Sequence, residues 1–152
     1  VLKIIDFEGE IFWEDQRDIT IGKASSGIYN NVDIPGISKN DHVLVAQLFN
    51  GDSLLAQNLF YFLPPKQLHL PEVSLSKETT KTESGYQIKF TSDKLVKNVF
   101  LFVNREGQFS NNYFDLLPGK PIKVNFKPGF GDNKPALDVE IRGLNELIKN
   151  QP

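Results

Sequence analysis

The sequence has no cysteine and no methionine, and only two histidines, His42 and His69, among its 152 residues. The absence of cysteine excludes disulfides, thiolate nucleophiles and cysteine-ligated metals. Two imidazoles are too few for a multi-histidine metal centre, so we predict neither a metal site nor any other cofactor. Because not even an initiator methionine is present, we expect the sequence to be an excerpt of a longer protein.

The sequence also lacks a large excess of charge of either sign, and it lacks long apolar segments. The 17 basic and 19 acidic residues give a net charge of −2, which provides no basic surface for nucleic acid. No segment approaches the ~18 consecutive apolar residues of a membrane-spanning helix, and the first residues lack the pattern of a secretory signal. We therefore expect no nucleic-acid partner and no membrane partner.

What is present is a period of two in the apolar residues, which predicts short β-strands. In the first part of the chain, Asn50-Gly51 is a favoured hairpin turn, and a second hairpin is expected around residues 6–10. The strands predicted there cover residues 2–5, 11–13, 18–21, 28–34, 43–49 and 54–63.

Three prolines within residues 64–71 predict a stiff, extended linker, because proline lacks the N–H that a sheet requires. A second series of predicted strands follows, over residues 73–78, 86–90, 99–103, 113–115, 121–126 and 136–142, with a closing helical turn at 144–149. Many short strands with frequent turns and almost no helical period are typical of a β-sandwich.

Side chains in a catalytic arrangement are not found. Asp138 and Glu140 share one face of a predicted strand, but that face is the polar one and is best explained by solvent. Neither His42 nor His69 neighbours a nucleophile motif. The glycine-containing loop 127–135 precedes a strand rather than the helix of a phosphate-binding loop, and it offers too few oxygen ligands for calcium. We predict no catalytic residue.

The aromatic residues are the remaining candidates for ligand binding. Trp13 alternates in phase with Ile11, which favours a place in the core. Core positions are also the simplest interpretation for five phenylalanines: Phe60, Phe62, Phe100, Phe102 and Phe126. The side chains kept as binding candidates are Tyr61, His69 and Phe130.

Two segments carry a more specific signal, NLFYFLPPK at residues 58–66 and FSNNYFDLLPGK at residues 109–120. In this order and spacing they resemble the C-terminal region of β-mannosidases of glycoside hydrolase family 2. The preceding segment IIDFEGEIFWE, residues 4–14, is similar to a hairpin in the middle sandwich of that family. Asn111 and Lys120 depart from the family pattern, which often has Asp and Glu there, without changing its apolar frame.

The resemblance implies an all-β chain of two tandem immunoglobulin-like β-sandwiches, the first truncated at its N-terminus. The expected parts are a partial sandwich over 1–63, the linker 64–71 and a second sandwich over 72–152. An incomplete first sandwich is expected to leave an unpaired edge near residues 1–7.

The resemblance also implies a noncatalytic role. In the family, the two catalytic glutamates lie on an upstream (β/α)8 barrel, which is therefore the expected partner within the same polypeptide. The parent enzyme would hydrolyse terminal nonreducing β-mannosyl residues by the retaining route. Contact with an oligosaccharide is a further candidate, and a bacterial periplasmic or extracellular location is expected.

The segment NYFDLLPG has a structural interpretation: we expect it to form a corner that closes the second sandwich. Tyr113 and Leu116 or Leu117 would plug the end of the core, with the tyrosine hydroxyl bonded to backbone, and Pro118-Gly119 would form a tight turn. The predicted structural residues are Asn112, Tyr113, Phe114, Asp115, Leu117, Pro118 and Gly119.

Two alternative functions remain open at this point. A carbohydrate-binding module would have the same fold class and an exposed row of aromatic rings. An adhesion or interaction module of a cell-surface protein would have a self-sufficient first domain.

Overall fold

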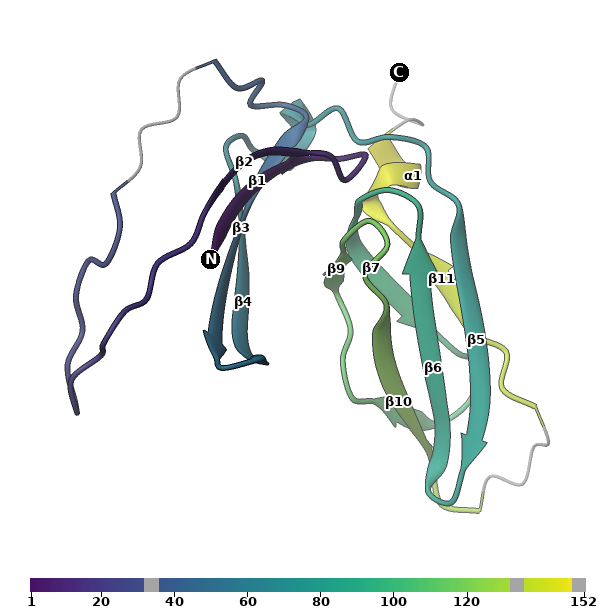
Figure 1. Cartoon of the computed structure of the whole chain (residues 1–152). Coiled ribbons are helices and arrows are strands. Elements are labelled where there is room, and N and C mark those ends of the chain that lie inside the picture. The colour runs from purple at the N-terminus through teal and green to yellow at the C-terminus, as the bar shows by residue number, and fades with distance from the viewer. Residues whose placement is uncertain (32–35, 132–135, 149–152) are drawn as a thin grey trace. The chain divides into compact units, whose positions relative to one another are not determined.

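The computed structural model describes residues 1–31, 36–131 and 136–148, and it divides into two compact units (Figure 1). The first unit comprises Val1–Asp6 and Glu10–His69, and the second comprises Phe7–Gly9 and Leu70–Pro152. In the described residues, eleven strands are accompanied by one 3-10 turn, Pro65–Gln67, and one five-residue helix. This composition confirms the all-β prediction.

The first unit is built on one antiparallel sheet with the strand order β2-β1-β3-β4. Its strands are β1 (Leu2–Asp6), β2 (Ile11–Asp15), β3 (His42–Asn50) and β4 (Ser53–Tyr61). The β1–β2 pair confirms the hairpin predicted around residues 6–10, and the β3–β4 pair, the second hairpin along the chain, confirms the one predicted at Asn50-Gly51. At the tip of the second, Gly51 has a φ of 56°, the positive value that a tight hairpin turn requires.

Two expectations for this unit are wrong. Residues 18–21 and 28–31 are not strands, and their isoleucines Ile19, Ile21 and Ile28 are exposed rather than packed; residues 32–34 lie outside the described part. The expected unpaired edge near residues 1–7 is also wrong, because β1 pairs with β2 on one side and β3 on the other. The edges of this sheet are β2 and β4.

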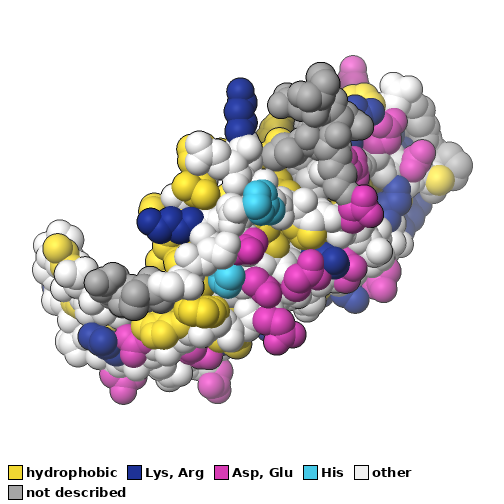
Figure 2. All heavy atoms as spheres, turned by 90° about the horizontal axis from the view of Figure 1, so that it is seen from above, with side chains coloured by type: hydrophobic (Ala, Val, Ile, Leu, Met, Phe, Trp, Pro, Cys, Tyr) yellow, Lys and Arg dark blue, Asp and Glu magenta, His cyan; other side chains and the backbone are white. Residues whose placement is uncertain are grey.

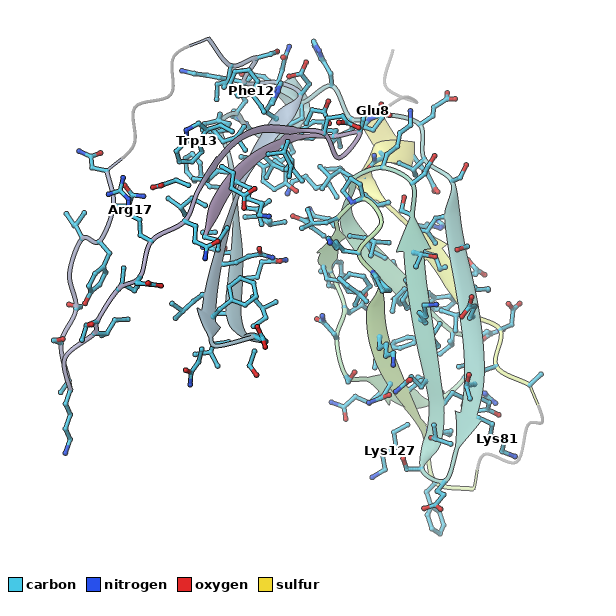
Figure 3. The ribbon with its side chains drawn as sticks, viewed as in Figure 1. Glu8, Phe12, Trp13, Arg17, Lys81 and Lys127 are labelled. Carbon is cyan, nitrogen blue, oxygen red and sulfur yellow. The ribbon has the colours of Figure 1, made fainter. Side chains whose placement is uncertain are left out.

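The apolar side chains of the first unit are unevenly buried. The buried ones are Ile4, Ile5, Val43, Val45 and Leu68. In the part of this unit that the structure describes, ten large apolar side chains are exposed: Ile11, Phe12, Ile19, Ile21, Ile28, Tyr29, Phe49, Leu54, Leu55 and Phe60. Phe60 is thus not a core residue, and Trp13, half-buried on β2 beside the exposed Phe12 (Figure 3), only partly fulfils the core prediction.

The second unit is a sandwich of two antiparallel sheets (Figure 1). One sheet has the order β5-β6-β10-β8, with β5 at Leu75–Thr82, β6 at Gly85–Ser92, β10 at Ile122–Pro128 and β8 at Gly107–Phe109. The other has the order β11-β7-β9, with β11 at Glu140–Arg142, β7 at Val96–Phe102 and β9 at Phe114–Leu116. Strict alternation along β6 explains the layer, because every second residue is buried.

The core lies between these two sheets. Its members share near-complete burial and come from both layers: Tyr86, Ile88, Phe90, Val96, Val99, Leu101, Phe114, Leu116, Val124, Phe126 and Val139. Gly85 fits closely against this core, since a Cβ there would lie 2.2 Å from the Phe126 carbonyl oxygen. A side chain at this position would therefore force the strands apart.

Two further elements complete the second unit. The helix α1 (Leu144–Ile148) holds the buried Asn145, whose side chain accepts from the Lys97 N–H at 2.9 Å and donates to the Leu95 carbonyl at 2.8 Å. Phe7 is 3% exposed, and its carbonyl accepts from the Leu95 N–H at 2.8 Å. Beside it, a hydrogen bond from Lys94 to the Glu8 carboxylate raises the pKa of Lys94.

Candidate functional site

The segment 112–119 begins with an asparagine that replaces missing strand pairing. The Asn112 carboxamide oxygen accepts from the backbone N–H groups of Leu101 at 2.8 Å and Tyr113 at 3.0 Å. Its amide nitrogen donates to the Leu101 carbonyl at 3.0 Å. One side chain therefore ties this loop to strand β7.

The centre of the segment is buried and carries an ion pair. Phe114, Leu116 and Leu117 lie in the core. Between them, the Asp115 carboxylate accepts from the Asn98 N–H at 2.7 Å and pairs with the Lys97 ammonium at 3.4 Å. Both side chains of the pair are largely buried, so each charge depends on the other for solvation.

A tight turn ends the segment. The Lys120 N–H donates to the Leu117 carbonyl at 3.1 Å, which closes a four-residue turn with Pro118 and Gly119 at its centre. Gly119 has a φ of 64°, which favours glycine at this turn position. These contacts give the segment the geometry of a structural corner.

Tyr113 departs from the expected arrangement. It does not plug the sandwich but is 68% exposed, with a φ of 59° that is unusual for a bulky residue. Its ring stacks on Phe100, with centroids 5.1 Å apart and planes inclined by 30°. Because Phe100 faces outward from β7, this stacking places the Tyr113 ring on the outer face of the sheet.

Phe102 joins these two rings on the outer face of the β11-β7-β9 sheet. Val99 and Leu101 of β7 point into the core, so Phe100 and Phe102 point outward, and Phe102 is 47% exposed. The core position predicted for Phe102 is therefore wrong. Apolar residues fill both faces of this strand, so alternation alone cannot tell which face is buried.

A charged pair borders the rings on the neighbouring strand. In the β7–β11 register, Phe100 is opposite Arg142 and Phe102 is opposite Glu140. Arg142 and Glu140 form an exposed ion pair at 3.6 Å. We call the set Phe100, Phe102, Tyr113, Arg142 and Glu140 the aromatic strip.

The binding candidates from the sequence occupy separate places. Tyr61 ends β4. His69 is exposed and its backbone N–H donates to the Asn40 carbonyl at 2.7 Å. Phe130 is fully exposed in the loop after β10, whose continuation at 132–135 lies outside the described residues.

The carboxylates and histidine considered for catalysis have ordinary surroundings. Asp138 and Glu140 each pair with a cation of their own, Lys77 and Arg142, and both are well exposed. His42 lies 2.5 Å from the Asp41 carboxylate. Burial alone would raise the pKa of Asp41, but hydrogen bonds from Ser38 and His42 outweigh it and hold that pKa below its usual value.

An open groove of about 1200 Å³ lies within the first unit. Exposed apolar side chains such as Ile19, Ile21, Tyr29 and Leu55 line it together with backbone of the sheet. Among the described residues, no three His, Cys, Asp or Glu side chains are grouped to hold a metal, and no helix is long and apolar enough to span a membrane. On the face shown in Figure 2, charges of both signs are interspersed with apolar side chains.

Two antiparallel sheets packed around one core define the second unit as an immunoglobulin-like sandwich domain, and a family model described as an Ig-fold domain matches residues 68–147. A second model, described as a Mannosidase Ig/CBM-like domain, matches residues 1–67. The chain belongs to the family of C-terminal immunoglobulin-like domains of glycoside hydrolase family 2 mannosidases.

A solved structure agrees in fold. The crystal structure of a β-D-mannosidase from Dictyoglomus thermophilum matches 93% of this chain with a TM-score of 0.75 and 23% sequence identity. The matched region is 18% of that enzyme's chain, so this sequence spans less than a fifth of the enzyme. No curated protein matches the sequence.

Proposed function

We propose that this chain is the noncatalytic accessory region of a β-mannosidase that hydrolyses terminal nonreducing β-mannosyl residues. The observation that carries the proposal is the tandem match of two mannosidase-associated domain models, over residues 1–67 and 68–147. Asp138 and Glu140 each pair with a cation at an exposed surface, an arrangement typical of surface charges rather than of a catalytic pair.

The role is architectural. The polypeptide upstream would supply a (β/α)8 barrel with the two catalytic carboxylates, and these domains would pack against it and stabilise it. The exposed apolar side chains that line one groove of the first unit support this assignment, because apolar groups gathered at one exposed surface mark a surface that a partner covers.

Two measurements test the proposal. The purified 152-residue chain should show no turnover of an aryl β-mannoside, and measurable turnover would contradict the noncatalytic assignment. The parent polypeptide, produced whole and without these residues, should lose thermal stability when they are removed. An unchanged melting temperature would contradict the architectural role.

A further inference from the structure

We propose that the aromatic strip is a carbohydrate-binding platform, in which one pyranose ring stacks on the open face of Tyr113. Phe102 would extend the apolar surface, and Arg142 would bond the sugar hydroxyls. The platform is carried by the second unit alone. It rests on the proposed function only for the expectation that the sugar is a β-linked mannose residue.

The backbone of Tyr113 is held in a conformation that exposes its ring. A φ of 59° is uncommon for a bulky side chain, and it is maintained by the Asn112 carboxamide, which binds both the Tyr113 N–H and the facing strand. A strained residue fixed in this way at the surface points to a functional use of its side chain.

The ring is also fixed in orientation. Phe100 covers one face of Tyr113 at a centroid distance of 5.1 Å, so the exposed 68% of the residue belongs mainly to the opposite face and the ring edge. Within the described part of the chain, no hydrogen bond engages the Tyr113 hydroxyl. Because the stacking on Phe100 already fixes the Tyr113 ring, binding a sugar would cost little further side-chain entropy.

The chemistry of the strip matches that of a sugar ring. One face of a pyranose presents C–H groups with partial positive charge, which suit the negative face of an aromatic ring. Its rim presents hydroxyls, for which the Arg142 guanidinium has five N–H donors and, among the described residues, one ion-pair partner, Glu140, at 3.6 Å. Arg142 lies opposite Phe100 in the strand register, so donor and stacked rings share one face.

The size of the strip favours a small ligand over a protein. Full burial of an aromatic side chain removes about 150–250 Å² from solvent, and Tyr113 and Phe102 are only 68% and 47% exposed. Together they fall well short of the about 800 Å² per partner that a stable protein interface buries. One or two stacked sugar units would suffice to cover them.

The test is a titration of the isotope-labelled 152-residue chain with β-1,4-mannotetraose, followed by amide chemical shifts. Saturable shifts are expected at Tyr113, Phe102 and Arg142. Tyr113→Asn removes the ring while tolerating positive φ, and it should weaken binding at least tenfold. Phe130→Asn, which removes a fully exposed ring elsewhere in the same unit, should leave binding unchanged.

Several outcomes would overturn the platform. One is the lack of saturable amide shifts with either mannotetraose or cellotetraose. A second is a set of shifts centred on residues outside the aromatic strip, and a third is equal binding by the wild type and Tyr113→Asn. A sedimentation coefficient that falls in Tyr113→Asn without any sugar response would show a protein interface instead. None of these readouts depends on mannosidase activity, so failure of the platform is distinguishable from failure of the proposed function.

Discussion

The two units contain similar kinds of residue but bury them very differently. Among the described residues of the second unit, fourteen apolar side chains are buried: Phe7, Tyr86, Ile88, Phe90, Leu95, Val96, Val99, Leu101, Phe114, Leu116, Leu117, Val124, Phe126 and Val139. Five are buried in the first unit, where a single sheet has no second layer among the described residues. Apolar alternation makes a sheet in both units, but a core forms only where two sheets face each other.

The edge strands show the same contrast. Strand β5 lies at the edge of its sheet and carries three charged side chains, Lys77, Glu78 and Lys81, which disfavour pairing with another chain. Strand β4 is an edge strand of nine residues with no charged side chain, and its Leu54, Leu55 and Phe60 are exposed. The β5 edge of the second unit is therefore suited to exposure to solvent, whereas the β4 edge of the first unit is not.

The largest effect is expected from truncating the core of the second unit. Phe90→Ala should lower the free energy of unfolding by about 3–5 kcal/mol, because the side chain is completely buried between the sheets. Urea denaturation and amide hydrogen exchange in β6 measure it. Phe60→Ala in the first unit should change stability by only about 0.5 kcal/mol, since Phe60 is 58% exposed. Similar losses of stability from both variants would contradict the contrast in burial between the two units.

The next effect concerns the buried ion pair. Asp115→Ala should destabilise the second unit by about 2–3 kcal/mol, because it removes the buried carboxylate that pairs with the Lys97 ammonium and accepts from the Asn98 N–H. Asp115→Asn keeps an oxygen that can accept from the Asn98 N–H, so it should lose less stability than Asp115→Ala. The measurement is urea denaturation, and an equal loss in both variants would assign the whole effect to the charge.

A smaller effect is expected at the asparagine that ties the loop to β7. Asn112→Ala removes three hydrogen bonds and should lower stability by about 1–3 kcal/mol. Its exposed neighbour provides the control, because Asn111→Ala should be nearly neutral. The same denaturation assay separates them, and a neutral Asn112→Ala would argue that water can replace the side chain.

The smallest effect on stability is expected at the edge of the first unit. Leu55→Lys should change the free energy of unfolding by no more than about 0.5 kcal/mol, because the side chain is 61% exposed. It should nevertheless reduce self-association on warming, measured by light scattering, since the charge opposes pairing along β4. Thr80→Lys on the already charged β5 should leave scattering unchanged.

Sequence reasoning succeeded where local chemistry decides the structure. Asn50-Gly51 specifies its hairpin whatever surrounds it, and the apolar alternation of residues 86–90 specifies one buried face. It failed at Ile19 and Ile28, where alternation is present but no partner strand pairs with it. A strand is a property of two segments, so a pattern in one segment is not sufficient.

The aromatic strip was missed for a related reason. In the sequence VFLFV of residues 99–103, both faces are apolar, so the outward direction of Phe100 and Phe102 depends on register with β9 and β11. The exposure of Tyr113 depends on a positive φ held by the Asn112 side chain. The tandem Asn-Asn before the aromatic pair is the one local signal that indicates a departure from regular strand geometry.

The membership of Phe7–Gly9 in the second unit bears on how the chain folds. The Glu8–Lys94 hydrogen bond joins residues 86 positions apart, and the buried Phe7 ring lies at the same distant end of the chain. Closing so long a loop is entropically slow compared with forming the local hairpins. We expect these three residues to dock late, after the strands of the second unit that follow them in the chain have been synthesised.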